Sequence, residues 1–139
     1  MPGTEPVPSR SGPRHQARER ALSLLYEAEI KQLPVDEVLA ALPAAPDPYA
    51  ATLVRGVHAD AERIDALLSE AAVGWELDRM PAVDRAVLRL AVFELLEQRD
   101  VPVAVVLDEA VALAGEYSTD DSGRFVNGVL ATVAARVRG

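Results

Sequence analysis

The amino-acid sequence predicts an all-α fold, and three observations carry this prediction. Apolar residues recur at helical spacing in nearly every segment after residue 13. No segment that can be defended as a strand alternates apolar and polar residues with a period of two. Proline, glycine and short polar clusters separate the periodic segments, as in loops between helices. With 139 residues, half of them hydrophobic, the chain is long enough for one domain with a real core.

Residues 1–13 are expected to form a disordered leader outside the fold. They hold four of the ten prolines and little apolar surface, so they cannot build a core. The first helix is expected from residue 14 to about residue 32, where it stops before Pro34. Its apolar side chains form one helical stripe, which consists of Ala17, Ala21, Leu24, Leu25 and Ala28.

The next segments predict a short helix at residues 36–42, a rigid loop at 43–48 and a long third helix at about 49–72. The third helix carries an apolar stripe of Leu53, Val57, Ala61, Ile64, Leu68 and Ala71. Gly56 lies inside this helix, where glycine costs about 1 kcal/mol relative to alanine. We therefore expect another helix to pack closely against Gly56.

The segment from Pro81 to about residue 98 is expected to be the central helix. Gly74 ends the preceding helix, residues 75–80 form a connector, and proline suits a first helical position. Apolar side chains surround much of the helix, so several neighbours should bury it. They are Val83, Val87, Leu88, Ala91, Val92, Leu95 and Leu96.

Two further helices complete the predicted bundle. One starts around Asp100 and Pro102 and reaches about Tyr117, and the polar cluster at residues 118–122 supplies N-cap oxygens for the last helix. The Asn127-Gly128 pair inside the last helix resembles a type I′ hairpin turn. The flanking apolar runs are too short for paired strands, and the spacing of Val126, Val129, Leu130, Val133 and Val137 is helical, so we favour the helix.

The charge of the chain is unevenly distributed. Lys and Arg number 14 against 22 Asp and Glu, for a net charge of -8, yet residues 1–20 carry a net +2. An acidic body argues against a nonspecific nucleic-acid binder, which leaves the basic N-terminal end to be explained. The absence of cysteine excludes disulfides, thiolate nucleophiles and cysteine-zinc sites. Neither a signal-peptide core nor a run of 18 apolar residues is present, so we expect no membrane association.

No catalytic residue, metal site or cofactor is expected. GxSxG, Walker A and GxGxxG motifs are absent. His58 and Glu62 are four residues apart on one helix face, but two ligands do not make a metal site. Carboxylates at helix starts usually act as caps or dipole partners. Asp121 is therefore interpreted first as a cap and second as a binding residue.

The start of the first helix is a candidate for RNA binding. It carries the basic residues Arg14, His15, Arg18 and Arg20. Arg14 and Arg18 share a face, and Tyr26 lies about two turns beyond Arg18 near that face. Guanidinium groups on phosphates and a base stacked on a ring suit single-stranded RNA. The alternative is that the basic residues form salt bridges with the acidic body.

The start of the last helix repeats this pattern. Arg124 stands beside Phe125, again a basic residue next to an aromatic ring. The alternative for Phe125 is a place in the hydrophobic core.

Four segments together resemble the NusB family of bacterial transcription antitermination factors. They are residues 14–26 (RHQARERALSLLY), 83–96 (VDRAVLRLAVFELL), 100–114 (DVPVAVVLDEAVALA) and 118–130 (STDDSGRFVNGVL). They follow the family's order and spacing over roughly residues 14–137. The resemblance implies one helical domain at 14–139, with about six or seven helices in two antiparallel halves, residues 14–72 and 76–137.

The resemblance also implies a function without catalysis. NusB-like proteins pair with NusE, a small-subunit ribosomal protein, and bind the single-stranded boxA element of nascent ribosomal RNA. The assembly joins NusA, NusG and RNA polymerase in the bacterial cytoplasm. The family is compatible with a monomer and with a homodimer. The competing interpretations are a helical interaction module without an RNA role, and a fragment of an RNA methyltransferase.

The resemblance places the interface on two parts of the chain. Asp84 is expected near the RNA and NusE surfaces. The expected RNA contacts are Arg14, His15, Arg18, Arg20, Tyr26, Asp121, Ser122, Arg124 and Phe125. Ala104 and Gly115 stand where lysines are common in the family, which predicts weak binding to RNA alone because each phosphate contact adds affinity.

Overall fold

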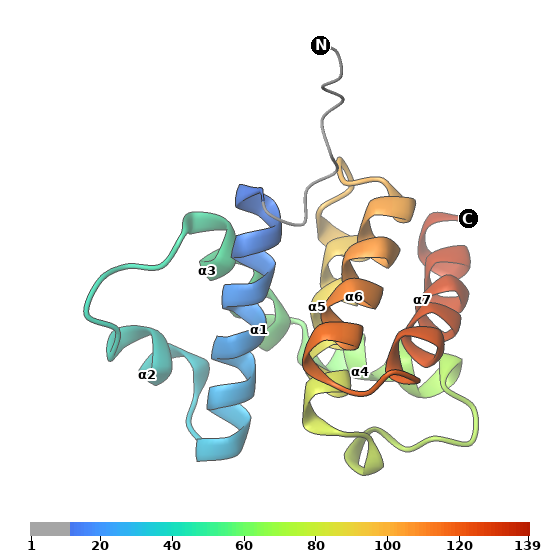
Figure 1. Ribbon diagram of the computed structural model, residues 1–139, viewed down its shortest axis with the longest axis horizontal. Coiled ribbons are helices and arrows are strands. Elements are labelled where there is room, and N and C mark those ends of the chain that lie inside the picture. Colours follow the sequence, from blue (N-terminus) through green and yellow to red (C-terminus); the bar gives the residue numbers. More distant parts are fainter. Residues whose placement is uncertain (1–11) are drawn as a thin grey trace.

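The computed structural model describes residues 12–139 and folds them into helices joined by short loops (Figure 1). In this part of the chain there are seven α-helices and one turn of 3₁₀ helix, and no strand. The predicted all-α fold is therefore confirmed. The predicted leader lies outside the described residues except for Gly12 and Pro13, which opens the first helix. The elements are α1 Pro13–Lys31, α2 Val35–Ala40, α3 Pro48–Ala59, α4 Ala61–Ala71, η1 Leu77–Arg79, α5 Ala82–Glu97, α6 Val103–Tyr117 and α7 Ser122–Arg138.

Helix α5 is the centre of the bundle. It packs against α1, α3, α4, α6 and α7, and every residue from Leu90 to Leu96 is buried. This confirms the expectation that a helix apolar around most of its girth is covered by several neighbours. One residue in this buried run, Glu94, is charged, so the interior must provide it with a partner.

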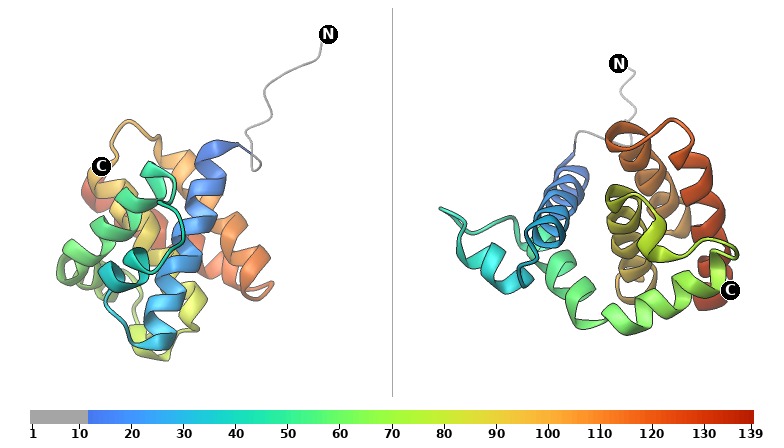
Figure 2. Two further views of the ribbon diagram at one scale, coloured as in Figure 1. Left: turned by 90° about the vertical axis from the view of Figure 1, so that its left-hand side faces the viewer. Right: turned by 90° about the horizontal axis from the view of Figure 1, so that it is seen from below.

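The other helices are arranged around α5 in two groups. Helices α5, α6 and α7 stand side by side with alternating direction (Figure 1). Helix α1 runs antiparallel to α5, α2 packs on the outer side of α1, and α3 packs against α1, α2 and α5. Helix α4 passes beneath both groups and packs against α5 and α7 (Figure 2, right). Its residues precede the connector at 75–80, yet α4 supports the C-terminal helices.

The long third helix predicted for residues 49–72 was wrong, because the structure has two helices there. Helix α3 ends at Ala59, Asp60 leaves helical geometry with φ -103° and ψ 19°, and α4 begins at Ala61. Both helices pack against α5, but their other partners differ. Helix α3 also packs against α1 and α2, whereas α4 also packs against α7. A straight helix could not reach both, so the chain bends at Asp60.

The close approach predicted at Gly56 is confirmed. A methyl group added to the Gly56 Cα would overlap the ring of Phe93 on α5. The missing side chain therefore lets α3 lie directly on the central helix. A second glycine, Gly74, has a φ of +86°, in the left-handed region that glycine tolerates best, and follows the end of α4 as expected.

The helix predicted at the C-terminal end is also confirmed. Helix α7 runs unbroken through Asn127 and Gly128, which rejects the hairpin interpretation. Pro81 and Pro102 sit one residue before the first helical residues of α5 and α6, so each proline occupies the cap position instead of the first turn. Among the described helices, none is both long and apolar enough to cross a bilayer.

Candidate nucleic-acid interface

The predicted basic start of α1 is divided between the surface and the interior. Arg14 and Arg20 are exposed, whereas the side chains of His15 and Arg18 are only 3% exposed. The Arg14 guanidinium carbon lies 3.8 Å from the centre of the Tyr49 ring, a cation–π contact. The helical spacing correctly predicted that Arg14 and Arg18 share one side of α1. At the position of Arg18, however, this side faces the core.

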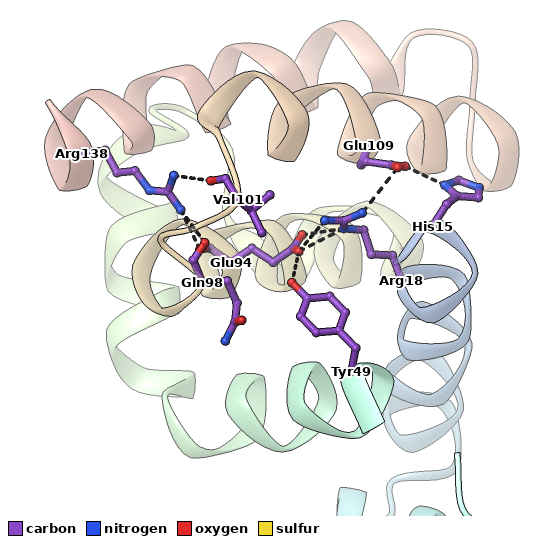
Figure 3. A network of polar contacts seen from close by, with 8 residues as sticks. All are labelled: His15, Arg18, Tyr49, Glu94, Gln98, Val101, Glu109 and Arg138. Carbon is purple, nitrogen blue, oxygen red and sulfur yellow. Dashed lines mark hydrogen bonds and ion pairs between the residues drawn. The ribbon is translucent and has the colours of Figure 1, made fainter. Parts of the chain in front are cut away.

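Arg18 forms a buried ion pair with Glu94 of the central helix (Figure 3). Its Nε donates to both carboxylate oxygens at 3.0 Å, and its Nη2 lies 2.9 Å from Oε2. Burial lowers the pKa of Arg18, but the hydrogen bond to Glu94 and the charge of that carboxylate outweigh it and raise the pKa overall. Arg18 therefore stays charged and compensates the acid inside α5.

Tyr49 at the start of α3 completes this buried network. Its hydroxyl donates to Glu94 Oε2 at 2.5 Å (Figure 3), and its ring also contacts the Arg14 guanidinium. Burial, together with the hydrogen bond to Glu94 and the charge of that residue, raises the pKa of Tyr49. The network thus joins α1, α3 and α5. Sequence reasoning missed Tyr49 and Glu94, although a glutamate within the apolar run of α5 was a visible signal.

His15 lies between α1 and α6, where it contacts a carboxylate of α6. Its Nδ1 lies 2.6 Å from Glu109 Oε2, and its Nε2 lies 3.7 Å from Glu19 Oε2. On the other side of Glu19, the Tyr117 hydroxyl donates to Oε2 at 2.6 Å. That hydrogen bond, with partial burial and the charges of Glu19 and Glu116, raises the pKa of Tyr117 to about 12. His15 is therefore held by carboxylates and is not presented to solvent.

The residues predicted from the last motif gather at the start of α7. A cleft of about 290 Å³ is lined there by aromatic, apolar and polar side chains. Trp75 and Phe125 meet edge to face with ring centres 5.6 Å apart. Phe125 packs against the core from a half-buried position, so both of its predicted environments are present. The lining residues are Trp75, Met80, Pro81, Asp84, Thr119, Asp121, Ser122 and Phe125.

Asp84, the predicted partner-binding residue, lies beneath this cleft. It is 4% exposed, and its Oδ2 accepts a hydrogen bond from Ser122 Oγ at 3.0 Å. Its Oδ1 is buried and has no hydrogen-bond partner among the described residues. Ser122 is also 4% exposed and contacts Thr119 and Ser118. Asp84 and Ser122 thus fasten the start of α7 to the start of α5.

Asp121 and Arg124 are exposed in the same region. Asp121 occupies the cap position of α7, but its side chain makes no capping hydrogen bond. The prediction that the Asp121 side chain caps α7 was therefore wrong. The Asp121 backbone is already helical, with φ -82° and ψ -16°. A capping carboxylate normally needs an extended backbone to reach the amides of the first turn.

Tyr26 lies near the same end of the molecule. It is 41% exposed and lines a cleft of about 330 Å³ that also includes Ala82 of α5. The neighbouring residue, Pro81, lines the cleft of Asp121 and Phe125. Ala82, Ala86 and Arg89 of α5 line the Tyr26 cleft, whereas Asp84 lines the other, so the two clefts open on different faces of the start of α5. Arg14 lies 12 residues before Tyr26 on α1, a distance of about 18 Å along the helix.

The structure therefore sorts the predicted residues into two places. Tyr26, Phe125, Asp121 and Arg124 are near the start of α5, and Arg14 is at the opposite end of α1. Comparison with known protein families identifies the class of protein to which the chain belongs. Residues 15–135 match the model of the NusB family. The chain belongs to the NusB family.

Individual relatives agree with the family match. The transcription antitermination protein NusB of Saccharopolyspora erythraea is 53% identical over 129 residues, which cover 88% of this chain and 87% of the relative. NusB of T. maritima is 35% identical and superimposes with a TM-score of 0.82, over 89% of this chain and 92% of that one. The resemblance drawn from the four sequence segments is thereby confirmed.

A further solved structure similar to this chain contains a complex. It holds the antitermination factors NusB and NusE with double-stranded RNA. The matched chain is 28% identical to this one with a TM-score of 0.76, over 88% of this chain and 96% of that chain.

Proposed function

We propose that this chain is an RNA-binding transcription antitermination factor that acts together with NusE. In this proposal the pair binds the boxA element of nascent ribosomal RNA and joins NusA, NusG and RNA polymerase. The observation that carries the proposal is the likeness to the NusB–NusE complex with RNA, which extends over 88% of this chain. Such a factor works at the transcribing polymerase, so we place the chain in the bacterial cytoplasm. We assign it no catalytic role.

Exposure separates the proposed RNA contacts from the residues that support them. Six predicted residues offer side chains to a ligand at the surface: Arg14, Arg20, Tyr26, Asp121, Arg124 and Phe125. Arg18, Asp84 and Ser122 are buried and paired with other side chains, so we propose that they hold the helices in place. His15 belongs with this second group, because its Nδ1 already contacts Glu109.

The charge of the chain supports a requirement for a partner. The net charge is -8, and Arg18, one of the four arginines counted in residues 1–20, is neutralised in the interior. RNA affinity depends on how many phosphates are met by cations. We therefore propose that the chain alone binds RNA weakly and that NusE supplies much of the remaining positive charge.

A binding experiment with and without NusE tests the proposal. We expect a labelled single-stranded boxA RNA to bind the mixture more tightly than either protein alone, measured by fluorescence anisotropy. Tyr26→Ala should cost about 1–3 kcal/mol of binding free energy through lost base stacking. Arg20→Ala should reduce the slope of log K against log salt by roughly 0.7 for one lost phosphate contact.

Arg55→Ala is the matched control for Arg20→Ala. Arg55 is an exposed arginine on α3 that lines neither of the clefts near Tyr26 and Phe125. Its replacement should leave the affinity and the salt slope unchanged. An RNA affinity that NusE does not alter would contradict the proposal. If this chain binds NusE but adds nothing to the RNA affinity of NusE, an interaction module without an RNA role is favoured instead. A duplex of the same sequence shows whether single strands are preferred.

A further inference from the structure

Three potential metal ligands converge where α1 and α6 meet. They are His15 and Glu19 of α1 and Glu116 of α6, and one ligand atom from each lies within 4.8 Å of the other two. His15 and Glu19 are one helical turn apart, which puts their side chains on one face of α1. The third ligand comes from a helix that is distant in sequence. His58 and Glu62 are also one helical turn apart, but no third ligand from the described residues joins them.

The histidine is oriented as metal-bound histidines usually are. Its side chain is 3% exposed, and its Nδ1 lies 2.6 Å from Glu109 Oε2 on α6. A carboxylate on one ring nitrogen fixes the proton there and turns the lone pair of the other nitrogen outward. In this structure the other nitrogen, Nε2, faces the Glu19 carboxylate. Glu19 is itself held by the Tyr117 hydroxyl at 2.6 Å, so both ligands have supporting partners.

The separation between His15 and Glu19 is too long for a direct hydrogen bond and is close to that of two zinc ligands. The distance from His15 Nε2 to Glu19 Oε2 is 3.7 Å. Two atoms that each bind zinc at about 2.0–2.1 Å with tetrahedral angles are about 3.4 Å apart. Glu116 is exposed, so its carboxylate can move the remaining distance at little cost.

The local charge also calls for a cation. Ion pairs among the described residues link Glu19 to His15 and Glu109 to His15 and Arg18, and none of these pairs involves Glu116. Three carboxylates, Glu19, Glu109 and Glu116, thus lie around His15, and Arg18, which pairs with Glu109, is shared with Glu94.

We propose that His15, Glu19 and Glu116 form a zinc site that joins α1 to α6, with Glu109 and Tyr117 orienting the ligands. The site has one imidazole and two carboxylates, a ligand set that zinc accepts with water in the fourth position. It lies apart from the clefts of Tyr26 and Phe125 and does not depend on the proposed RNA role. The sequence did not predict it, because the helical spacing that pairs His15 with Glu19 says nothing of Glu116.

Calorimetry on the full chain tests the site. The protein must carry no affinity tag and be freed of metal with a chelator before titration with zinc chloride. We expect one equivalent of zinc to bind, and we expect zinc to raise the melting temperature because it binds only the folded state. Glu116→Gln should weaken zinc binding at least about tenfold and remove the rise in melting temperature.

Two further variants complete the test. Glu109→Gln should weaken zinc binding by roughly 10–100-fold, as expected for a residue that orients a metal-bound histidine. His58→Gln removes the other described histidine, which is exposed on α3, and should change nothing. The site is wrong if zinc does not bind at one equivalent, or if Glu116→Gln binds it as tightly as the natural chain does. Glu116 is exposed, so its variant stays folded even where replacement of His15 does not.

Discussion

Arg18 shows how a charged residue can be essential to a fold while contacting nothing outside it. Glu94 lies in the middle of the most buried helix and is 1% exposed, so without a cation it would carry an uncompensated charge. Arg18 provides three nitrogen–oxygen contacts to it, and the Tyr49 hydroxyl provides a fourth polar contact, a hydrogen bond. The pair thus specifies how α1 and α3 are seated on α5.

We predict that Arg18→Met destabilises the chain strongly. Removal of one partner of a buried ion pair typically costs about 3–5 kcal/mol, because the other charge stays buried without compensation. Urea unfolding followed by circular dichroism measures the change. Arg14→Met is the matched control, since Arg14 is exposed and loses only a cation–π contact worth about 0.5–1 kcal/mol. Equal unfolding midpoints for the two variants would contradict the structural role of Arg18.

The burial of Arg18 could not be predicted from helical spacing, and the reason is simple. Helical periodicity reveals which residues share a side, and it put Arg18 beside Arg14. The same angle, however, places Arg18 on the stripe of Ala17 and Ala21, which are buried. Its partners Glu94 and Tyr49 are 76 and 31 positions away in sequence, so no local spacing could reveal them. Arg14, in the first turn of α1, remains exposed, whereas the next residue, His15, is buried.

At the scale of helices, the sequence predicted the order and type of the elements well. Central helix α5, the connector and unbroken α7 were all found from apolar spacing and proline positions. The bend at Asp60 was not found, because the apolar stripe continues across it: Val57 and Ile64 are both buried. The bend depends on which helices each half must cover, and such tertiary contacts leave no local signal.

The packing of α3 on α5 gives a prediction in which two similar substitutions have opposite effects. Gly56→Ala should destabilise the chain by about 1–3 kcal/mol, because the new methyl group overlaps the buried Phe93 ring. Gly128→Ala should stabilise it by about 1 kcal/mol, because nothing lies within 4 Å of the new methyl group and alanine favours the helix. Thermal and urea unfolding measure both. Stabilisation by Gly56→Ala would show that α3 is not seated closely on α5.

For the molecule as a whole, arginines at the partly exposed ends of the bundle connect other helices to the central helix α5. Arg85 and Arg89 of α5 both contact Glu29 of α1, and Arg89 also forms a two-nitrogen contact with Asp65 of α4. At the other end, Arg138 of α7 donates to the backbone carbonyls of Glu94, Leu95 and Gln98, which end α5 (Figure 3 shows Arg138 there). These contacts join α1, α4 and α7 to the central helix.

The Glu29 contacts predict how stability depends on pH. The hydrogen bond from Arg85 lowers the pKa of Glu29 from its ordinary value of 4.5; burial opposes this, and the charges of Arg85 and Arg89 add to it. A group whose pKa is lower in the folded state binds its proton more readily when unfolded. Its contribution to stability is therefore complete above pH 4.5 and is lost as the pH falls through the lower, folded-state pKa.

We therefore expect Glu29→Gln to remove part of the acid sensitivity of the chain. The free energy of unfolding, measured by urea titration between pH 6 and pH 3, should fall less steeply in this variant than in the natural chain. One proton taken up on unfolding corresponds to a slope of about 1.4 kcal/mol per pH unit, which is the upper limit for the difference. Glu27→Gln removes the same charge from an exposed pair with Lys31, and such pairs contribute little. If both variants change the slope equally, the bridge from α1 to α5 does not control acid unfolding. If only Glu29→Gln does, the joining of the two helix groups depends on this carboxylate staying ionised.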